Sequence, residues 1–162
     1  FLDSDDLWLP CKLEYSLHFA NERNAPFIFT GFRRMSSDGS RIGHYIRAPR
    51  ILSYWRLLGN TAIATSTVMI DRRSVGHVVM RDTYYDDLDC WLRILKSGYV
   101  AHGINKDLMR YRVLPESVSR DKYRSASKVW HAYRELEQLE WPVAVLFFVQ
   151  YALRGMLKYI RF

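Results

Sequence analysis

One segment near the middle of the chain constrains the fold most, because its apolar residues recur with the period of a helix. The positions i, i+3, i+4 and i+7 are held by Leu88, Trp91, Leu92 and Leu95. This spacing places all four side chains on one face of a helix. Gly98 follows as a C-terminal stop. The sequence therefore predicts an amphipathic helix here that buries its apolar face.

The rest of the chain alternates between strand-like and helix-like patterns. We expect Phe1-Leu2 to be the end of a strand, and further strands over 26–32, 42–46, 64–71, 99–104 and 108–113. Turn-forming residues at 36–40 join two of them in a hairpin. We expect helices over 10–21 and 49–58, and from about residue 121 to the end with an interruption at Pro142. This order predicts an α/β fold over residues 1–120 and a basic helical tail over residues 121–162.

Composition narrows the class of protein. The chain has 162 residues, 49% of them hydrophobic and 25% charged, so it can bury a core and is not a disordered chain. A net charge of +7 predicts a surface that attracts phosphates, anionic lipid or nucleic acid. Cys11 and Cys90 lack the spacing of a zinc site or a disulfide framework, which favours a reducing, cytoplasmic setting.

Three carboxylates follow the first two residues closely. They are Asp3, Asp5 and Asp6. In an extended chain, positions i and i+2 point the same way, so Asp3 and Asp5 can aim at one point. Clustered hard oxygen ligands suit Mg²⁺ or Mn²⁺. The alternative is a solvated acidic turn that begins a helix, whereas an EF-hand is disfavoured because Leu7 and Trp8 occupy its ligand and glycine positions.

A second acidic group begins the amphipathic helix. Asp86 and Asp87 are stabilised there by the helix dipole, which is a sufficient structural reason for them. The functional alternative is that one of them faces a cleft and takes a proton from a hydroxyl. Asp89 and Arg93, four residues apart, are expected to pair on the surface.

A basic segment follows the last expected strand, from Tyr111 to Arg120. Its arginines and serines could hold phosphate, because a guanidinium offers paired donors to two oxygens. The alternative is an ordinary basic surface loop.

Together these segments resemble one family. Residues 1–14 resemble the stretch around the DxD motif of family 2 glycosyltransferases, in which the acidic turn precedes Trp, Pro and a Lys-Leu-Glu helix. Residues 85–95 resemble the acidic-pair helix of these enzymes, often written ED-x-x-x-W-L. Residues 65–70 resemble the strand between the two motifs, and residues 111–119 resemble the loop after the last strand. The order and spacing of all four agree, so the resemblance covers roughly residues 1–120.

The resemblance implies a partial GT-A fold in which residues 1–120 form the DxD turn and the acceptor-binding, catalytic half. The family's nucleotide-binding strands precede the DxD turn, so we expect the N-terminal nucleotide-binding half to be absent and the chain to be incomplete.

The resemblance also implies roles for residues. Asp5 is the direct metal ligand, Asp3 a second ligand that faces the sugar or ribose, and Asp6 supports them. With Arg112, these residues contact the nucleotide-diphospho-sugar, and the metal is Mg²⁺ or Mn²⁺. Asp87 is the general base. Asp86 stands beside it where the family usually has Glu.

The C-terminal part of the tail, residues 141–162, indicates a contact with a membrane surface. Residues 141–153 are apolar and aromatic, and Arg154, Lys158 and Arg161 follow without an acid. This pattern is typical of a helix in a membrane interface, although packing on the core or in a dimer is the alternative. As a helix, these residues span roughly 20 Å, too short to cross a bilayer. No nucleic-acid-binding motif is present, so we expect no nucleic acid partner.

We therefore expect an inverting glycosyltransferase that moves a sugar from a nucleotide-diphosphate donor to a hydroxyl of a saccharide or lipid-linked acceptor. Its role would be bacterial cell-envelope polysaccharide biosynthesis, in the cytoplasm at the inner face of the plasma membrane, with residues 141–162 as the membrane contact. The alternative is a non-catalytic membrane-surface or interaction domain, or an inactive fragment. A phosphohydrolase is disfavoured because the small-residue and Gly-Thr sequence of such nucleophile loops does not follow Asp5.

Overall fold

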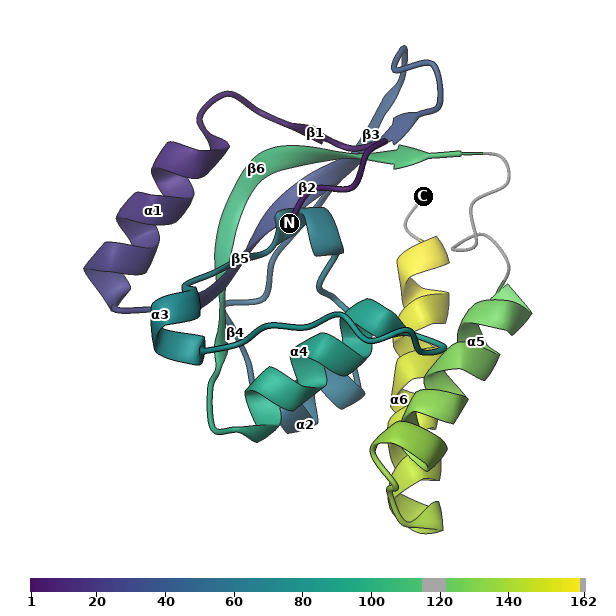
Figure 1. The fold of residues 1–162 in the computed structure, drawn as a ribbon. Coiled ribbons are helices and arrows are strands. Elements are labelled where there is room, and N and C mark those ends of the chain that lie inside the picture. The colour runs from purple at the N-terminus through teal and green to yellow at the C-terminus, as the bar shows by residue number, and fades with distance from the viewer. Residues whose placement is uncertain (115–121, 161–162) are drawn as a thin grey trace.

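Two long parallel strands form the centre of the molecule, which the computed structural model describes at residues 1–114 and 122–160 (Figure 1). Strand β2 (Phe27–Ser36) pairs with β6 (Ala101–Val113) from one end to the other. The register shifts after Thr30 and again after Gly31. Four short strands complete a mixed sheet around this pair.

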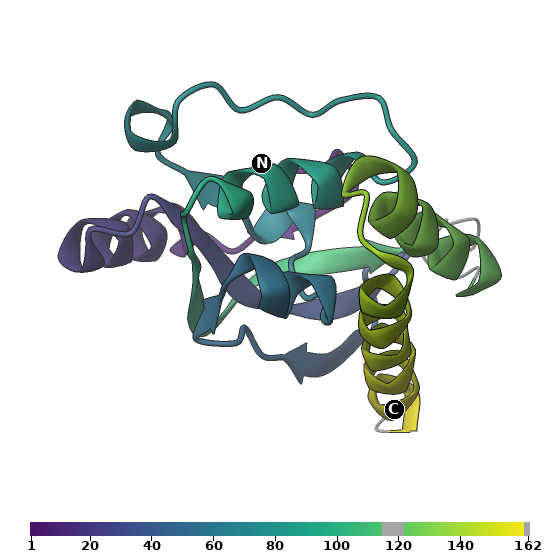
Figure 2. The ribbon, with the colours of Figure 1, turned by 90° about the horizontal axis from the view of Figure 1, so that it is seen from below.

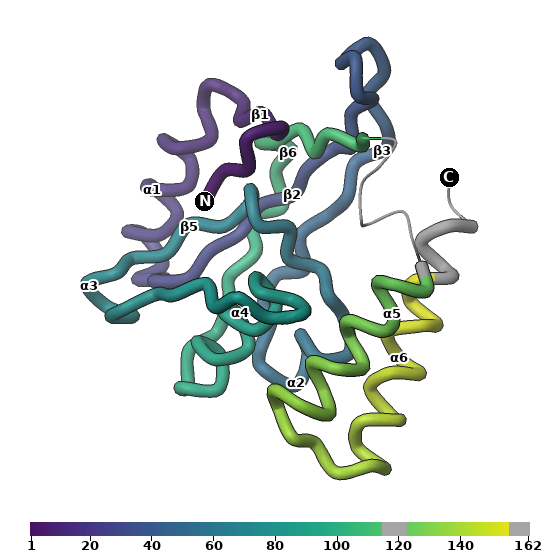
Figure 3. The backbone as a smooth tube through the Cα atoms, turned by 45° about the vertical axis from the view of Figure 1, so that its right-hand side comes forward, coloured from purple at the N-terminus to yellow at the C-terminus, as the bar shows by residue number. Residues whose placement is uncertain are grey.

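The short strands lie at the two ends of the central pair. β3 (Ile42–Ile46) and β5 (Met69–Ile70) pair with β2, while β1 (Leu7–Trp8) and β4 (Ile51–Leu52) pair with β6. All four run antiparallel to their neighbours. The β1 pairing positions the acidic turn, because it holds the residues just before β1 against the C-terminal part of β6 (Figure 3).

Helices cover both faces of the sheet because successive strand residues point to opposite sides. Ile28 faces α1 (Lys12–Arg23) in a small cluster with Ala25, Ile104 and Leu108. Its neighbours Phe27 and Phe29 face the main core, to which α2 (Tyr54–Leu58) and α4 (Asp86–Lys96) contribute. α3 (Arg72–Val75) is a single short turn beside β5.

The C-terminal helices pack on the side of the molecule opposite α1 (Figures 1 and 2). α5 (Lys122–His131) continues into a π-helical turn (Ala132–Leu136), and α6 spans Trp141–Ile160. Both helices reach the main core, to which they contribute Val129, Ala132, Tyr133 and Ala144. One face of the tail therefore packs on the core, as the alternative to membrane contact predicts.

Several predicted elements are confirmed. α4 begins at Asp86, and Gly98 adopts a φ of +95° just after it. α1 lies two residues later than expected, and the hairpin of β2 and β3 forms across the predicted turn. The helical tail is present, but its break lies at residues 137–140 and Pro142 belongs to the first turn of α6. Proline is tolerated there because the first turn needs no N–H donor.

The predicted helix over residues 49–58 is wrong in its first half. Ile51 and Leu52 form β4 and pair with His102 and Ala101, so only residues 54–58 are helical. The strands pack so closely that a Cβ at Gly103 would lie 2.0 Å from the Pro49 carbonyl oxygen. Sheet pairing with a distant segment thus overrides a local helical pattern.

Three strand predictions also need correction. Phe1-Leu2 lies outside any strand. The expected strand over 64–71 is a 3₁₀ turn (Thr65–Thr67) followed by β5, because the Thr67 hydroxyl donates to the Ala64 carbonyl and favours a turn. The expected strands 99–104 and 108–113 are one strand, because pairing with β2 resumes after a register shift, with Thr30 opposite Ile104 and Gly31 opposite Asp107.

Candidate functional site

The acidic turn, residues 3–6, is closed by its own backbone and held against β6. The Asp6 amide donates to the Asp3 carbonyl at 3.2 Å. Asp6 is buried, and its Oδ1 accepts from the Arg112 amide at 2.8 Å. Burial raises the pKa of Asp6, and the Ser66 hydroxyl and the Arg112 amide oppose this rise. Asp6 therefore holds the turn against β6 from inside.

Asp3 and Asp5 face outward from this turn. Asp3 is exposed and Asp5 is half-buried. In the described part of the chain, neither carboxylate has a hydrogen-bond or ion-pair partner, although the Asp3 amide donates to Ser66 Oγ at 3.0 Å. The backbone of the turn is thus fixed while two carboxylates stay available to a ligand.

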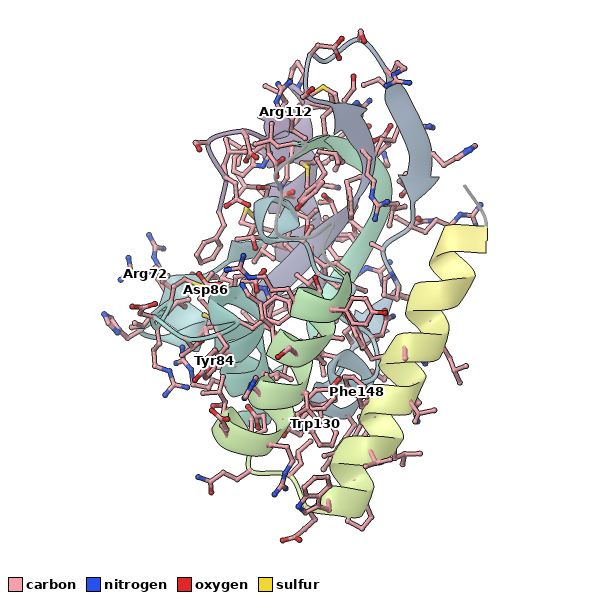
Figure 4. The ribbon with its side chains drawn as sticks, turned by 90° about the vertical axis from the view of Figure 1, so that its right-hand side faces the viewer. Arg72, Tyr84, Asp86, Arg112, Trp130 and Phe148 are labelled. Atoms are coloured by element: carbon pink, nitrogen blue, oxygen red, sulfur yellow. The ribbon has the colours of Figure 1, made fainter. Side chains whose placement is uncertain are left out.

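Arg112 lies at the end of the sheet near the hairpin (Figure 4). Its Nε donates to the Asp5 carbonyl at 2.7 Å, and its Nη1 donates to the Ser37 carbonyl at 2.7 Å. The guanidinium therefore clamps the acidic turn to the hairpin. Residues 115–120 of the same predicted phosphate-binding loop lie outside the described residues.

Asp86 and Asp87 are the first two residues of α4 but differ in environment. Asp86 is exposed and Asp87 is half-buried. Asp87 Oδ2 accepts from the Thr65 hydroxyl at 2.7 Å, and Oδ1 accepts from the Leu88 amide at 2.6 Å. Both oxygens of Asp87 are therefore held in place.

Electrostatics link Asp87 to the acidic turn. Burial raises the pKa of Asp87, the two hydrogen bonds oppose the rise, and the charges of Asp86 and Asp3 add to it. Asp3 acts on the pKa of Asp6 in the same way. The structure thus brings the two predicted acidic segments close enough for their charges to interact.

Asp89 has a structural role. It pairs with Arg93 at 3.1 Å as predicted, but it is only 1% exposed and also binds Arg81, so the predicted surface pair is in fact buried at Asp89. Burial alone would raise the pKa of Asp89, yet the two arginines hold it below its usual value. Asp89 fixes α4 to the loop before it.

The 65–67 turn, Thr65–Thr67, contacts both acidic segments and was not predicted as part of the site. Thr65 binds Asp87, and Ser66 accepts from the Asp3 amide through Oγ and from Trp8 Nε1 through its carbonyl, the latter at 2.7 Å. The sequence signal is three consecutive hydroxyl residues, which favour turns. The β-branched residues around them favoured a strand and concealed this signal.

Lys12 is a second residue that sequence reasoning missed. It is fully buried beside the 65–67 turn. Its Nζ donates to the Thr67 carbonyl at 3.2 Å and lies 4.4 Å from the centre of the Trp8 ring. Burial lowers the pKa of Lys12 to about 8. The lysine thus anchors α1 to the 65–67 turn.

The donor set of the acidic turn fits a divalent cation that is shared with a ligand. Asp3 and Asp5 offer hard carboxylate oxygens, and Asp6 Oδ2 is buried without a hydrogen-bond partner among the described residues. Within residues 1–114 and 122–160, no three His, Cys, Asp or Glu side chains are arranged so that they could hold a metal ion by themselves. Mg²⁺ commonly uses one or two carboxylates together with substrate phosphates, so this turn suits a metal–diphosphate complex.

An apolar surface lies on α6. The exposed apolar residues on its outer side, here called the apolar face of α6, are Trp141, Val145, Leu146, Val149 and Leu153. A shallow cavity of about 480 Å³ adjoins it and is lined by Ala126, Ser127, Trp130, Val145 and Phe148. Figure 4 shows Trp130 and Phe148 at the contact between α5 and α6. In the described part of the chain, no helix combines the length and apolar character needed to cross a bilayer.

Comparisons with known proteins point to one class of enzyme. No family model matches the chain. Over 159 residues, 98% of the chain, it is 43% identical to TuaG of Bacillus subtilis, a glycosyltransferase assigned to teichuronic acid biosynthesis. It is 28% and 29% identical, again over 98% of its length, to WfgD and WfaP of Escherichia coli, each named a UDP-Glc:α-D-GlcNAc-diphosphoundecaprenol β-1,3-glucosyltransferase. The chain spans 62–63% of the length of these relatives.

Proposed function

We propose that the chain forms the acceptor-binding and catalytic part of an inverting GT-A glycosyltransferase in bacterial cell-envelope polysaccharide biosynthesis. The similarity to TuaG, WfgD and WfaP along nearly the whole chain supports this class. The α/β fold, with a mixed sheet and the acidic turn at the edge of that sheet, is consistent with a partial GT-A fold. The proposal extends the activity in the relatives' names to this chain.

The observation that carries the proposal is the placement of Asp87 at the start of α4 beside the acidic turn. Thr65 and the Leu88 amide hold its two oxygens, and each carboxylate oxygen keeps a lone pair for a further donor. Ionised Asp87 would accept the proton of an acceptor hydroxyl. The hydroxyl oxygen then bonds to the anomeric carbon from the face opposite the diphosphate, the bond to the diphosphate breaks, and the anomeric configuration inverts.

The acidic turn would bind the donor. Asp5 and Asp3 are the residues that would hold Mg²⁺ or Mn²⁺, and Asp6 keeps the turn in shape from behind. Such an ion, when bound, neutralises charge on the leaving diphosphate. Arg112 acts through the Asp5 carbonyl, so its contribution to donor binding is to fix the turn. Asp86, exposed beside the base, would contact the acceptor.

The names of WfgD and WfaP suggest the substrates. Both use UDP-glucose and a diphosphoundecaprenol-linked acceptor by name. We propose a UDP-sugar as donor and a saccharide on a polyprenyl diphosphate as acceptor. This acceptor lies in the membrane, so the enzyme must work at the membrane surface.

The apolar face of α6 is the proposed contact with the inner face of the plasma membrane. Four of its residues are spaced four positions apart, from Trp141 to Leu153, and Leu146 lies next to Val145, so all five share one broad side of the helix. Trp141 stands at one end of the face, and the Arg134 guanidinium lies 4.9 Å from the centre of its ring. Aromatic and basic side chains are favoured at headgroup depth. Lys158 and Arg161 of the predicted basic end lie where side chains are not described.

Sugar transfer by the natural full-length protein tests the proposed function. UDP-glucose, Mn²⁺ and a polyprenyl-diphosphate GlcNAc acceptor are expected to give a disaccharide product of inverted anomeric configuration, detected by mass spectrometry and NMR. Calorimetry with UDP and Mn²⁺ separates the alternatives. Binding without transfer would point to a different acceptor, whereas neither binding nor transfer of any UDP-sugar would favour the non-catalytic alternative.

Vesicle flotation tests the membrane contact separately. We expect the protein to float with vesicles that contain anionic lipid, and the pair Val145→Glu and Leu146→Glu to abolish flotation. Leu13→Glu and Leu17→Glu on α1, where both leucines are similarly exposed, form the matched control and should still float. Equal loss in both pairs would contradict a contact at α6.

A further inference from the structure

The 65–67 turn holds the two acidic segments through neighbouring residues. Thr65 Oγ1 donates to Asp87 Oδ2 at 2.7 Å. The next residue, Ser66, accepts from the Asp3 amide at 3.0 Å. Segments about eighty residues apart in sequence are therefore joined through two adjacent side chains.

The turn is itself fixed from the protein interior. Ser66 and Thr67 are fully buried. Trp8 Nε1 donates to the Ser66 carbonyl at 2.7 Å, and Lys12 Nζ donates to the Thr67 carbonyl at 3.2 Å. Trp8 and Lys12 both belong to the segment that follows the acidic turn. The acidic turn and Asp87 therefore share one rigid support, which is the 65–67 turn.

We propose that Thr65 is a positioning residue for Asp87, and that the 65–67 turn sets the separation between the base and the metal-binding acidic turn. This inference rests on the proposed function. A carboxylate held at one oxygen can still rotate about its Cβ–Cγ bond, since that torsion is broad. Thr65 prevents this rotation by holding the second oxygen, and its own β-branched side chain is restricted at χ1.

A hydroxyl-to-aspartate hydrogen bond outside the proposed site provides the control. The Ser74 hydroxyl donates to Asp71 Oδ2 at 2.8 Å at the start of α3. Thr65→Val and Ser74→Ala therefore each remove one such hydrogen bond. Only the first removes a hydrogen bond to Asp87.

Steady-state kinetics of the natural full-length protein tests the proposal. For Thr65→Val, we expect kcat to fall about 10- to 100-fold, the usual effect of losing one hydrogen bond to a charged group, with KM for the donor within about twofold. Thr65→Ser restores the hydroxyl and should recover most of kcat. Ser74→Ala should stay within about threefold of wild type. Equal losses in Thr65→Val and Ser74→Ala, or a kcat for Thr65→Val near wild type, would overturn the proposal.

A double-mutant cycle with Asp87→Asn identifies the partner through which Thr65 acts. In the Asp87→Asn background, Thr65→Val should cause no further loss of residual kcat. An undiminished further loss would show that Thr65 acts elsewhere and would refute the proposal.

The same cycle, measured by chemical denaturation, does not depend on activity. A coupling of at least about twofold in the unfolding equilibrium constant is expected between residues in direct contact. If the wild-type protein transfers no sugar but this coupling is present, the proposed function fails while the positioning of Asp87 by Thr65 stands. Absence of the coupling refutes the positioning.

Discussion

The two acidic segments contain the same number of carboxylates but hold them differently. Each has three aspartates within four residues, at 3–6 and at 86–89. In each, one aspartate is buried and serves the structure: Asp6 in the turn and Asp89 in the helix. The others differ, because both oxygens of Asp87 are hydrogen-bonded whereas Asp3 and Asp5 have no such partner in the described residues.

This difference separates two kinds of chemistry. A helix fixes the direction of each side chain, so its start can present a base at a set position for proton transfer. A turn fixed only through its backbone leaves its carboxylates free to adjust to the geometry that a metal demands. The comparison predicts that changes in the helix alter turnover and changes in the turn alter ligand binding.

The largest effect is expected for Asp87→Asn. Without a base, kcat should fall about a thousandfold, while KM for the donor changes little because the acidic turn is intact. Initial rates with UDP-sugar and Mn²⁺ measure both. Asp82→Asn, an exposed acid in the loop before α4, is the matched control, and an equal loss there would contradict a specific role for Asp87.

The next largest effect is expected for Asp5→Ala. Loss of a metal ligand should lower kcat/KM about a hundredfold and weaken Mn²⁺ binding in the presence of UDP. Electron paramagnetic resonance of free Mn²⁺ measures the binding. Chelation with EDTA should abolish transfer by the wild type and added Mn²⁺ should restore it. Normal Mn²⁺ binding by Asp5→Ala would show that the acidic turn is not the metal site. It would contradict the division of roles between the acidic turn and the start of α4.

The buried cation behind the turn predicts a pH effect on stability. The pKa of Lys12 is about 8 in the folded protein and that of an unfolded lysine is near its ordinary value of about 10.4. Between these values the unfolded state binds more protons, so the free energy of unfolding should rise with pH, by up to about 3 kcal/mol. Lys12→Met should flatten this rise in urea titrations from pH 7 to 10.5. An unchanged slope would show that other groups cause it.

A smaller effect on stability is expected for the buried anion of the helix. Asp89→Asn weakens the pairing with Arg81 and Arg93, whose side chains are both more exposed than that of Asp89. We therefore expect the free energy of unfolding to fall by about 2 kcal/mol. Because its folded pKa is lowered, this contribution is present above the unfolded pKa of about 3.9 and is lost as pH falls through the folded pKa. Urea titrations at pH 7 and pH 3 measure it. By contrast, Asp87→Asn should leave stability unchanged or higher, because it removes a partly buried charge.

The elements predicted well from sequence are those whose signal is local. The periodic residues of α4 and the turn at 36–40 act within a few positions, so their prediction is confirmed. β4 and the unbroken β6 depend on pairing between distant segments. Polar residues at 105–107 therefore suggested a loop, although Asp107 itself pairs with Gly31 of β2.

The same reasoning applies to the site. The aspartates themselves were predicted because acidic clusters are visible in sequence. Thr65, Ser66 and Lys12 were missed because their partners lie 22 to 63 residues away. The roles of the aspartates remain predictions for the experiments above.

The pairing of β6 with β1, β2 and β4 has a consequence for the order of folding. The β2–β3 hairpin can form from neighbouring residues, whereas the pairings of β1, β2 and β4 with β6 all wait for a strand that ends at Val113. Contacts between segments so far apart are slow to form because a long loop must close first. During synthesis, the acidic turn leaves the ribosome before β6 does, and it gains its contacts with β6 only after residues 109–112 have emerged. The proposed catalytic centre is therefore complete only once β6 is in place, and a ribosome stalled before β6 would hold a chain in which the acidic turn lacks this pairing.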